Sequence, residues 1–208
     1  MRKINLRPIA LTCLLLLQMS IPGPAEPQKD TGHAEFKSRP ATGYPNKQTI
    51  EKVTIAVEQI ETDDQAREPF GKLNPYRYGI LPVLVVIQND GPDTIRVDRM
   101  TIDYLLPDRS KIENTPASEL RFLKSPGQPK AIPGPLGGMK LGKTKTNPLA
   151  DWTIEGRAFA AKMIPAGQSA SGFFYFQSPS SAAGKIYLSG MVHAGSGQEL
   201  FYFEIPVK

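Results

Sequence analysis

The chain contains 208 residues, of which 40% are hydrophobic and 22% are charged, and its formal net charge is +5. A chain of this length can form one domain of about 150 residues with a sizeable core, so it needs no disulfide to be stable. Its single cysteine, Cys13, excludes an intrachain disulfide and a metal site built from several thiolates.

The N-terminal 25 residues have the pattern of a secretory signal peptide. A basic segment at residues 2–7 is followed by an apolar segment at residues 9–17, and small residues at positions 23–25 then precede Glu26. The apolar segment is shorter than the about 20 residues that a membrane-spanning helix requires. We therefore expect an exported protein, periplasmic or secreted, with no transmembrane segment in the mature chain.

Cys13 offers an alternative, because Leu11-Thr12-Cys13 partly resembles the lipid-attachment motif of lipoproteins. In that case only residues 9–12 would form the apolar stretch before the cut, and the best apolar run, residues 14–17, would follow it. The sequence therefore favours a secretory signal over a lipoprotein signal.

Removal of the signal changes the charge of the protein. Three of the 25 Lys and Arg residues and none of the 20 Asp and Glu residues lie in the first 25 positions, so the mature chain has a net charge of +2. Nucleic-acid-binding domains present a clustered basic face. The mature chain gives no reason to expect nucleic acid as a partner.

Residues 26–48 combine prolines with polar residues and lack an apolar period, which predicts a flexible N-terminal linker. Strands are expected from residue 49 onward, so we assign residues 49–208 to one domain. Alternation of Val53, Ile55 and Val57 with polar residues predicts a half-buried strand. Residues 62–79 contain two prolines and two glycines and read as a loop.

The run of apolar residues 83–87 predicts a central strand that is covered on both faces. A turn at residues 89–93 follows, since Asn, Asp, Gly and Pro favour turn conformations. Beyond this turn the apolar alternation shifts by one residue near Asp98 and Arg99. A β-bulge at this point would keep the apolar side chains on one face.

A capping Thr, a Pro and an acidic residue predict one short helix near residues 116–123. Residues 124–151 are rich in Pro and Gly and are expected to form a long loop. Alternating strands follow at residues 158–164, 172–176, 186–193 and 201–207. The chain thus predicts an all-β fold, an immunoglobulin-like antiparallel β-sandwich of about seven strands. The side chains expected in its core are Val85, Ile87, Phe174, Phe176, Phe201 and Phe203.

Two motifs carry a resemblance to a known group of proteins. Residues 85–97 form a strand, an Asn-Asp-Gly turn and a second strand, and residues 164–176 form a Pro-Ala-Gly turn followed by a Gly-aromatic strand. This order resembles small exported bacterial immunoglobulin-like domains of uncharacterised function. The resemblance covers about residues 50–105 and 158–207. It implies a β-sandwich fold and supplies no functional site.

Catalytic and metal-binding patterns are not recognisable in the sequence, so no catalytic, metal or cofactor-binding residue is assigned and no cofactor is expected. The two histidines, His33 and His193, are far apart in the chain, and no Gly-x-Ser-x-Gly or P-loop pattern occurs. Paired carboxylates of a hydrolase depend on spatial separation, so the sequence leaves that alternative open.

We therefore expect an exported, non-enzymatic β-sandwich module that acts through contacts with an unknown protein or cell-envelope component. A carbohydrate-binding module that uses exposed aromatic side chains is one alternative, and a hydrolase with an unrecognised site is the other. The sequence leaves the oligomeric state open. Basic residues and aromatic residues of the loops are the candidate partner contacts: Lys140, Lys143, Lys145, Trp152, Tyr76 and Tyr78.

The signal-peptide assignment predicts the mass of the exported protein. Cleavage after Ala25 leaves Glu26 at the N-terminus and removes Cys13. Intact mass spectrometry of protein recovered from outside the cytoplasm should therefore show residues 26–208 without a lipid. A mass that retains Cys13 with attached acyl chains would overturn this assignment in favour of a lipoprotein.

Overall fold

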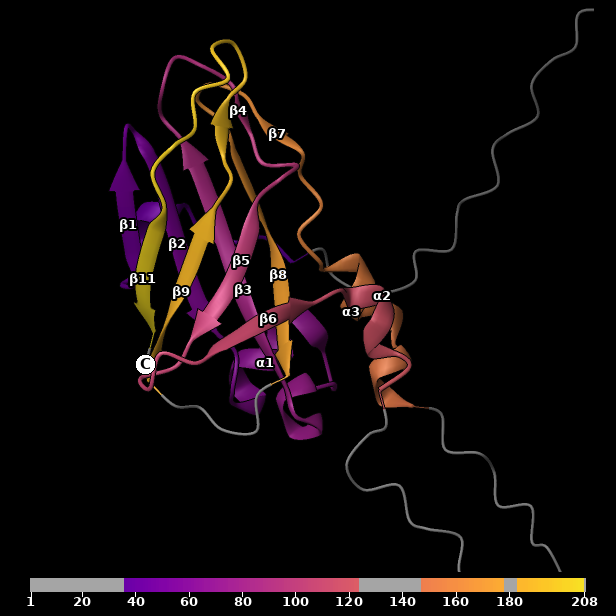
Figure 1. Cartoon of the computed structure of the whole chain (residues 1–208). Coiled ribbons are helices and arrows are strands. Elements are labelled where there is room, and N and C mark those ends of the chain that lie inside the picture. Colours follow the sequence, from indigo (N-terminus) through magenta and orange to yellow (C-terminus); the bar gives the residue numbers. More distant parts are fainter. Residues whose placement is uncertain (1–35, 124–146, 178–182, 208) are drawn as a thin grey trace, which may run out of the picture. The chain divides into compact units, whose positions relative to one another are not determined.

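Two layers of antiparallel strands make up most of the computed structural model, which describes residues 36–123, 147–177 and 183–207 (Figure 1). The first layer, sheet I, contains β1 (Lys47–Ile50), β2 (Val53–Gln59), β3 (Ile80–Asn89) and β8 (Ser169–Gln177). The second layer, sheet II, contains β6 (Lys111–Thr115), β5 (Thr101–Leu105), β9 (Gly184–Ser189) and β11 (Phe203–Val207). The predicted signal peptide with Cys13, and Lys140, Lys143 and Lys145, lie outside the described residues.

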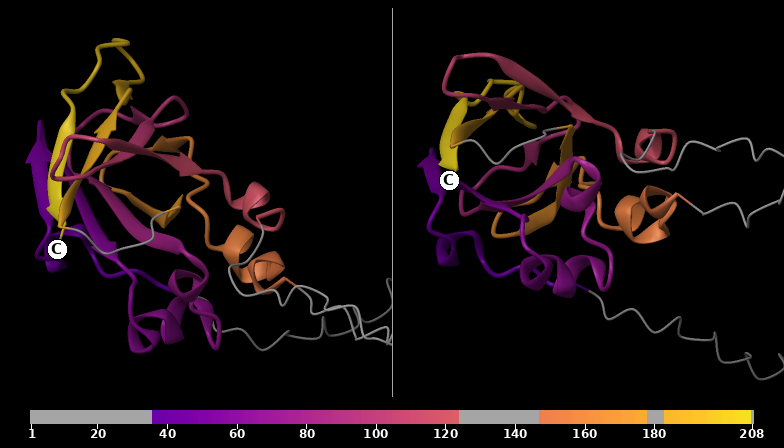
Figure 2. Two further views of the ribbon diagram at one scale, coloured as in Figure 1. Left: turned by 60° about the horizontal axis from the view of Figure 1, so that its bottom comes forward. Right: turned by 90° about the horizontal axis from the view of Figure 1, so that it is seen from below.

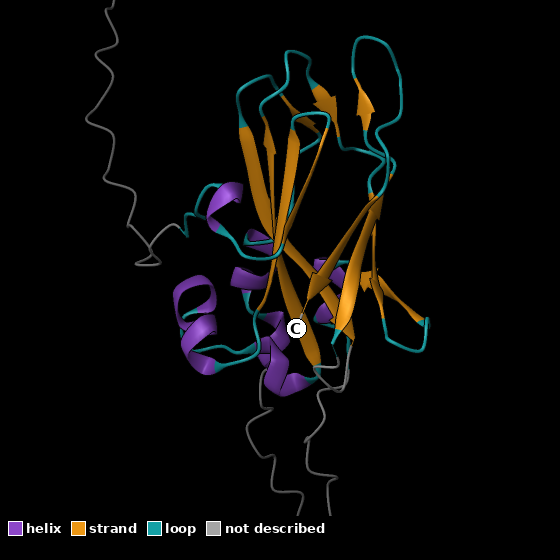
Figure 3. Cartoon of the chain, turned by 90° about the vertical axis from the view of Figure 1, so that its left-hand side faces the viewer, coloured by secondary structure: helices purple, strands orange, loops and turns teal. Residues whose placement is uncertain are grey.

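The strand β6 joins the two layers into one continuous order of eight strands, β1-β2-β3-β8-β6-β5-β9-β11. Glu113 of β6 pairs with Asp103 of β5, whereas the next residue, Asn114, pairs with Phe176 of β8. On the opposite side, the backbone N–H of Glu204 in β11 donates to the side chain of Gln48 in β1 at 2.8 Å. The layers are therefore connected along both sides, and Figure 3 shows them from the side on which β1 and β11 lie.

The inner core lies between the two sheets and is built by the strand alternation that the sequence displays. Its buried residues include Val53, Ile55, Val57, Leu81, Val83, Val85, Ile87, Ile102, Tyr104, Phe176, Ile186, Leu188, Phe203, Ile205 and Val207. Four of the predicted core residues, Val85, Ile87, Phe176 and Phe203, are confirmed as buried. Phe174 is only half-buried. Phe201 is 67% exposed because it precedes the first paired residue of β11, so its assignment to the core was wrong.

A second core covers the side of sheet I that points away from sheet II. Phe173 and Tyr175 of β8 point away from the inner core, yet both are buried. They are covered by residues of the N-terminal segment and of the helices: Ala41, Tyr44, Ala66, Phe70, Leu120, Leu149 and Ile154. Since β2 is buried on both faces as well, its prediction as a half-buried strand was wrong.

Short helices provide this cover, and the segment 62–79 that was predicted as a loop contains two of them. They are α1 (Asp63–Phe70) and the 3-10 helix η2 (Pro75–Tyr78). Thr62 begins α1 with a capping box, in which its hydroxyl accepts from the N–H of Gln65 at 3.3 Å and Gln65 Oε1 accepts from the N–H of Thr62 at 3.0 Å. Ala66 and Phe70 then lie on its buried side.

The remaining helices follow the expected outline more closely. Helix α2 (Ala117–Leu120) confirms the short helix predicted near residues 116–123. Of the predicted loop at 124–151, residues 124–146 lie outside the described part, and the end forms the 3-10 helix η3 (Pro148–Ala150) before α3 (Trp152–Gly156). No helix of the described residues is both long enough and apolar enough to cross a membrane.

A small third sheet replaces the bulge that was predicted at Asp98 and Arg99. It contains β10 (Val192–His193), β4 (Ile95–Arg96) and β7 (Met163–Ile164), and it lies at one end of the sandwich (Figure 1). The chain leaves β4, turns, and enters β5 of sheet II at Thr101. The shift in the apolar alternation thus marks the point where the chain passes from the third sheet to sheet II.

The N-terminal segment packs where a linker was expected. Residues 41–43 form the 3-10 helix η1, and Ala41 and Tyr44 are buried in the second core. Within the stretch 26–48, Phe36, Ala41 and Tyr44 therefore pack against sheet I, and Lys47 and Gln48 already belong to β1. The all-β antiparallel sandwich is confirmed, although short pieces raise the strand number of the described residues to eleven.

Burial predicts that two phenylalanines of the C-terminal half differ in their contribution to stability. Replacing Phe176 with Ala should lower the free energy of unfolding by about 3–5 kcal/mol, because a cavity remains in the inner core. Replacing Phe201 with Ala should cost less than about 1 kcal/mol because that side chain is exposed. Urea unfolding measures both values, and equal losses would contradict the assigned faces.

Two buried tyrosines predict a loss of stability in alkali. Burial raises the pKa of Tyr175, whose hydroxyl donates to the carbonyl of Ile154 at 2.7 Å, and it also raises the pKa of Tyr104. A group with a raised folded pKa stabilises the fold below its unfolded pKa, here about 10, and this contribution is lost as the pH rises above that value.

Tyrosinate absorbance at 295 nm and circular dichroism, recorded along one alkaline titration, test this expectation. The part of the absorbance change that belongs to Tyr104 and Tyr175 should appear only as the structure is lost. If every tyrosine ionises while the circular dichroism spectrum stays intact, the burial of Tyr104 and Tyr175 is contradicted.

Candidate functional site: the outer face of sheet II

Sheet II has a broad face that no helix of the described residues covers. In the view from below, the helices lie on the side of sheet I or at the end of the sandwich (Figure 2). The side chains that alternate with the core residues of sheet II point to this side. We call them the outer face: Thr101, Asp103, Leu105, Lys111, Glu113, Lys185, Tyr187, Ser189, Tyr202, Glu204 and Pro206. It is the natural place to look for a binding site.

Two tyrosines of the outer face stack against each other. The ring centroids of Tyr187 and Tyr202 are 5.4 Å apart, and the rings are inclined by 28°. The strand register explains the contact: Tyr187 pairs with Glu204, so Tyr202, two residues earlier, is its diagonal neighbour. Tyr202 is 54% exposed, and Phe201 beside it is more exposed still. Aromatic surface therefore faces the solvent here.

Charged residues on the outer face occur in pairs of opposite sign. Lys111 Nζ lies 2.9 Å from Asp103 Oδ2, and Lys185 Nζ lies 2.6 Å from Glu204 Oε1. The hydrogen bond to the Asp103 carboxylate, together with its charge, raises the pKa of Lys111. Asp103 is largely buried, whereas the Lys185–Glu204 pair is exposed and adds at most about 1 kcal/mol to stability. Both pairs leave the face with little net charge.

Hydroxyl groups lie next to the aromatic pair. Thr101 Oγ1 and Ser189 Oγ are 2.9 Å apart across β5 and β9. No hydrogen bond within the described part of the chain engages the hydroxyl of Tyr187 or Tyr202. Each hydroxyl can both donate and accept, so this part of the face offers both functions to a ligand.

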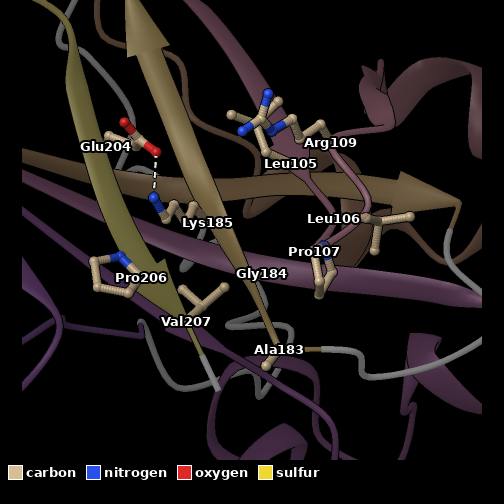
Figure 4. Close-up of a pocket in the computed structure, with 10 residues that line it drawn as sticks. All are labelled: Leu105, Leu106, Pro107, Arg109, Ala183, Gly184, Lys185, Glu204, Pro206 and Val207. Carbon is tan, nitrogen blue, oxygen red and sulfur yellow. Dashed lines mark hydrogen bonds and ion pairs between the residues drawn. The ribbon is translucent and has the colours of Figure 1, made fainter.

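A pocket continues the outer face toward the turn between β5 and β6 (Figure 4). Its volume of about 760 Å³ is within the range of about 300–1,000 Å³ that is typical of small-molecule sites. Its lining is mostly apolar, with one ion pair and one arginine: Leu105, Leu106, Pro107, Arg109, Ala183, Gly184, Lys185, Glu204, Pro206 and Val207. Lys185 and Glu204 line this pocket, and the strand register places Glu204 opposite Tyr187 of the aromatic pair.

Gly184 shapes the floor of the pocket. A Cβ at this position would lie 2.6 Å from the carbonyl oxygen of Leu105 and 2.7 Å from a ring carbon of Tyr104. Only glycine allows β9 to approach β5 this closely at this position. At the rim of the pocket, Arg109 adopts a left-handed conformation with a φ of 68° in the turn between β5 and β6.

The aromatic residues proposed from the sequence do not form one surface. Tyr76 packs against the inner core and Tyr78 against the second core. Trp152 is 54% exposed at the start of α3, where its indole lies over Gly156. The structure thus distributes these three side chains over different surroundings. The residues that do meet, Tyr187 and Tyr202, were visible in the sequence only as outward positions of two alternating strands.

His193 lies outside the outer face, at the end of the sandwich that carries the third sheet. Its Nε2 is 3.1 Å from Glu51 Oε2, and its Nδ1 is 3.9 Å from Asp93 Oδ2. These contacts join β10 to the turns that follow β1 and β3. Among the described residues, no group of three or more His, Cys, Asp or Glu side chains is arranged to hold a metal ion.

The fold and the site define an antiparallel β-sandwich in which one sheet presents an aromatic and polar face. No protein-family model matches the chain, and no curated protein matches its sequence.

Four chains of solved structures match the fold, two of which are described here. A candidate lipoprotein (ycdA) of Bacillus subtilis is 13% identical, with a TM-score of 0.36, over 76% of this chain and 38% of its own length. The chain therefore spans well under half of that protein. The secreted protein MPT63 of Mycobacterium tuberculosis is 8% identical, with a TM-score of 0.36, over 82% of this chain and 98% of its own length.

Proposed function

We propose that the protein is an exported, non-enzymatic binding module that contacts a protein or another component of the cell envelope through the outer face of sheet II. The signal-peptide pattern of residues 1–25 supports export. The unequal cover of the two sheets supports the choice of surface, and it is the observation that carries the proposal.

The two sheets differ in what their outward side chains do. On sheet I, the outward residues Phe173 and Tyr175 are buried beneath helices. On sheet II, the outward Tyr202 and its neighbour Phe201 are more than half exposed. Aromatic residues are enriched at the centres of protein interfaces, where they contribute much of the binding energy. An aromatic pair on an uncovered sheet therefore favours a role in binding.

A second contact region is proposed from the sequence alone. Lys140, Lys143 and Lys145 lie between two parts of the described chain, and Trp152 follows them at the start of α3. Lysines suit an acidic partner, because positive charge speeds the encounter. No observation on the described residues favours the hydrolase alternative.

The outer face predicts which substitutions remove the partner. The double variant Tyr187→Ala/Tyr202→Ala should lose the main component that the wild-type protein captures from an envelope extract, as measured by cross-linking and mass spectrometry. Phe122→Ala is the matched control, because Phe122 is an 80% exposed aromatic residue that does not belong to the outer face.

Thermal unfolding establishes that each variant is folded before it is compared. Replacement of Lys140, Lys143 and Lys145 with Glu, in a separate variant, tests the second region. Capture that survives the tyrosine variant and fails in the lysine variant would move the binding surface from sheet II to residues 140–145.

A further inference from the structure

We infer that the outer face of sheet II binds a neutral oligosaccharide, with Tyr187 and Tyr202 as the aromatic contact for the sugar rings. This inference rests on the proposed binding function and specifies its partner. It follows from three properties of the face: its balance of charge, its exposed aromatic surface and its supply of hydroxyl groups.

The charge balance argues for an uncharged ligand. Both lysines of the outer face are already paired, Lys111 with Asp103 and Lys185 with Glu204. The remaining acid, Glu113, lies 3.9 Å from Lys111. A polyanion or an anionic membrane would meet these carboxylates and would have to break the ion pairs. A neutral ligand leaves them in place.

The aromatic pair supplies apolar contact of the right kind. The face of an aromatic ring carries partial negative charge, which attracts the polarised C–H groups on the flat side of a sugar ring. Tyr202 uses one side of its ring in the stack with Tyr187 and still remains 54% exposed. Part of its surface is therefore available to a ligand.

The hydroxyl groups argue for a ligand that is itself rich in hydroxyls. Ser189 lies two residues after Tyr187 on β9 and Thr101 lies opposite Ser189 on β5, and the two phenols complete the set. An apolar partner would cover these groups without replacing their hydrogen bonds to water, which costs free energy. Sugar hydroxyls both donate and accept, so they can replace the lost water.

The dimensions suit a short chain of sugars. The outer face runs across four strands, β6, β5, β9 and β11, and three spacings of about 4.8 Å give a width of about 14 Å. The pocket beside Lys185 and Glu204 extends this surface toward the turn at Arg109. We expect an oligosaccharide of a few units to lie across the strands.

The experiment is a titration of the full chain with cellohexaose, chitohexaose, xylohexaose and maltohexaose. Calorimetry and the NMR signals of the tyrosine rings monitor the binding. At least one of these oligosaccharides should bind. Raising the NaCl concentration from 0.1 to 1 M should change its affinity less than about twofold, because screening acts on charges and not on a neutral ligand.

Variants assign the binding to the outer face. Tyr202→Ala should weaken it about tenfold, whereas Tyr202→Phe, which keeps the ring, should stay within about threefold of the wild type. Thr101→Val removes one hydroxyl without changing the shape of the side chain and should weaken binding about threefold or more. Phe122→Ala serves as the control and should bind like the wild type.

The inference is overturned if no oligosaccharide of the panel binds, or if Tyr202→Ala and Thr101→Val both bind like the wild type. Dextran sulfate, a polyanion, is titrated as a comparison. The inference is also overturned if only dextran sulfate binds and salt abolishes its binding. The envelope capture described above separates this failure from failure of the proposed function. If the double tyrosine variant loses a captured protein while no oligosaccharide binds, the binding face stands and its ligand is a protein.

Discussion

The strand β3 imposes the constraint on which the rest of the architecture depends. From Ile80 to Ile87 every residue is buried, and its side chains alternate between two separate cores. A strand without a polar face must be covered from both sides. Sheet II covers one side, and the N-terminal segment with the short helices covers the other.

This division of cover explains why the two sheets differ. The helices of the described chain are short, and four of their buried apolar residues, Ala66, Phe70, Leu120 and Ile154, belong to the second core, on sheet I. Sheet II completes the inner core with one face and is left with polar alternation on the other, as Ile186 and Leu188 point inward while Lys185 and Tyr187 point outward. The candidate binding surface is thus a consequence of how the apolar residues are distributed in the sequence.

The sequence predicted those features that depend on local pattern. The buried run at residues 83–87, the turn that follows it and the helix near residue 117 were all recognised. The capping box of Thr62 and Gln65 was also present in the sequence, but Pro69 and the lack of a clear apolar period concealed the helix. Phe201 was misassigned because alternation alone does not show where pairing begins.

The candidate site depends on long-range register, which no local pattern contains. Tyr187 and Tyr202 meet only because β9 and β11 pair with Tyr187 opposite Glu204. A register shifted by one residue would place one of these rings in the core. Tyr76 and Tyr78 were named from the sequence instead, and contacts with the two cores limit the exposure of these side chains.

The contact between β1 and β11 also bears on how the protein behaves in concentrated solution. A long unpaired strand at the border of a sheet invites the same strand of another molecule, which leads to aggregation. Here the first and last strands of the eight lie beside each other, and the Gln48 side chain accepts the N–H that Glu204 would otherwise present to a neighbour. Strand addition at this border is therefore blocked from within. In this way the protein holds an exposed aromatic surface while the border between β1 and β11 stays closed to strand addition.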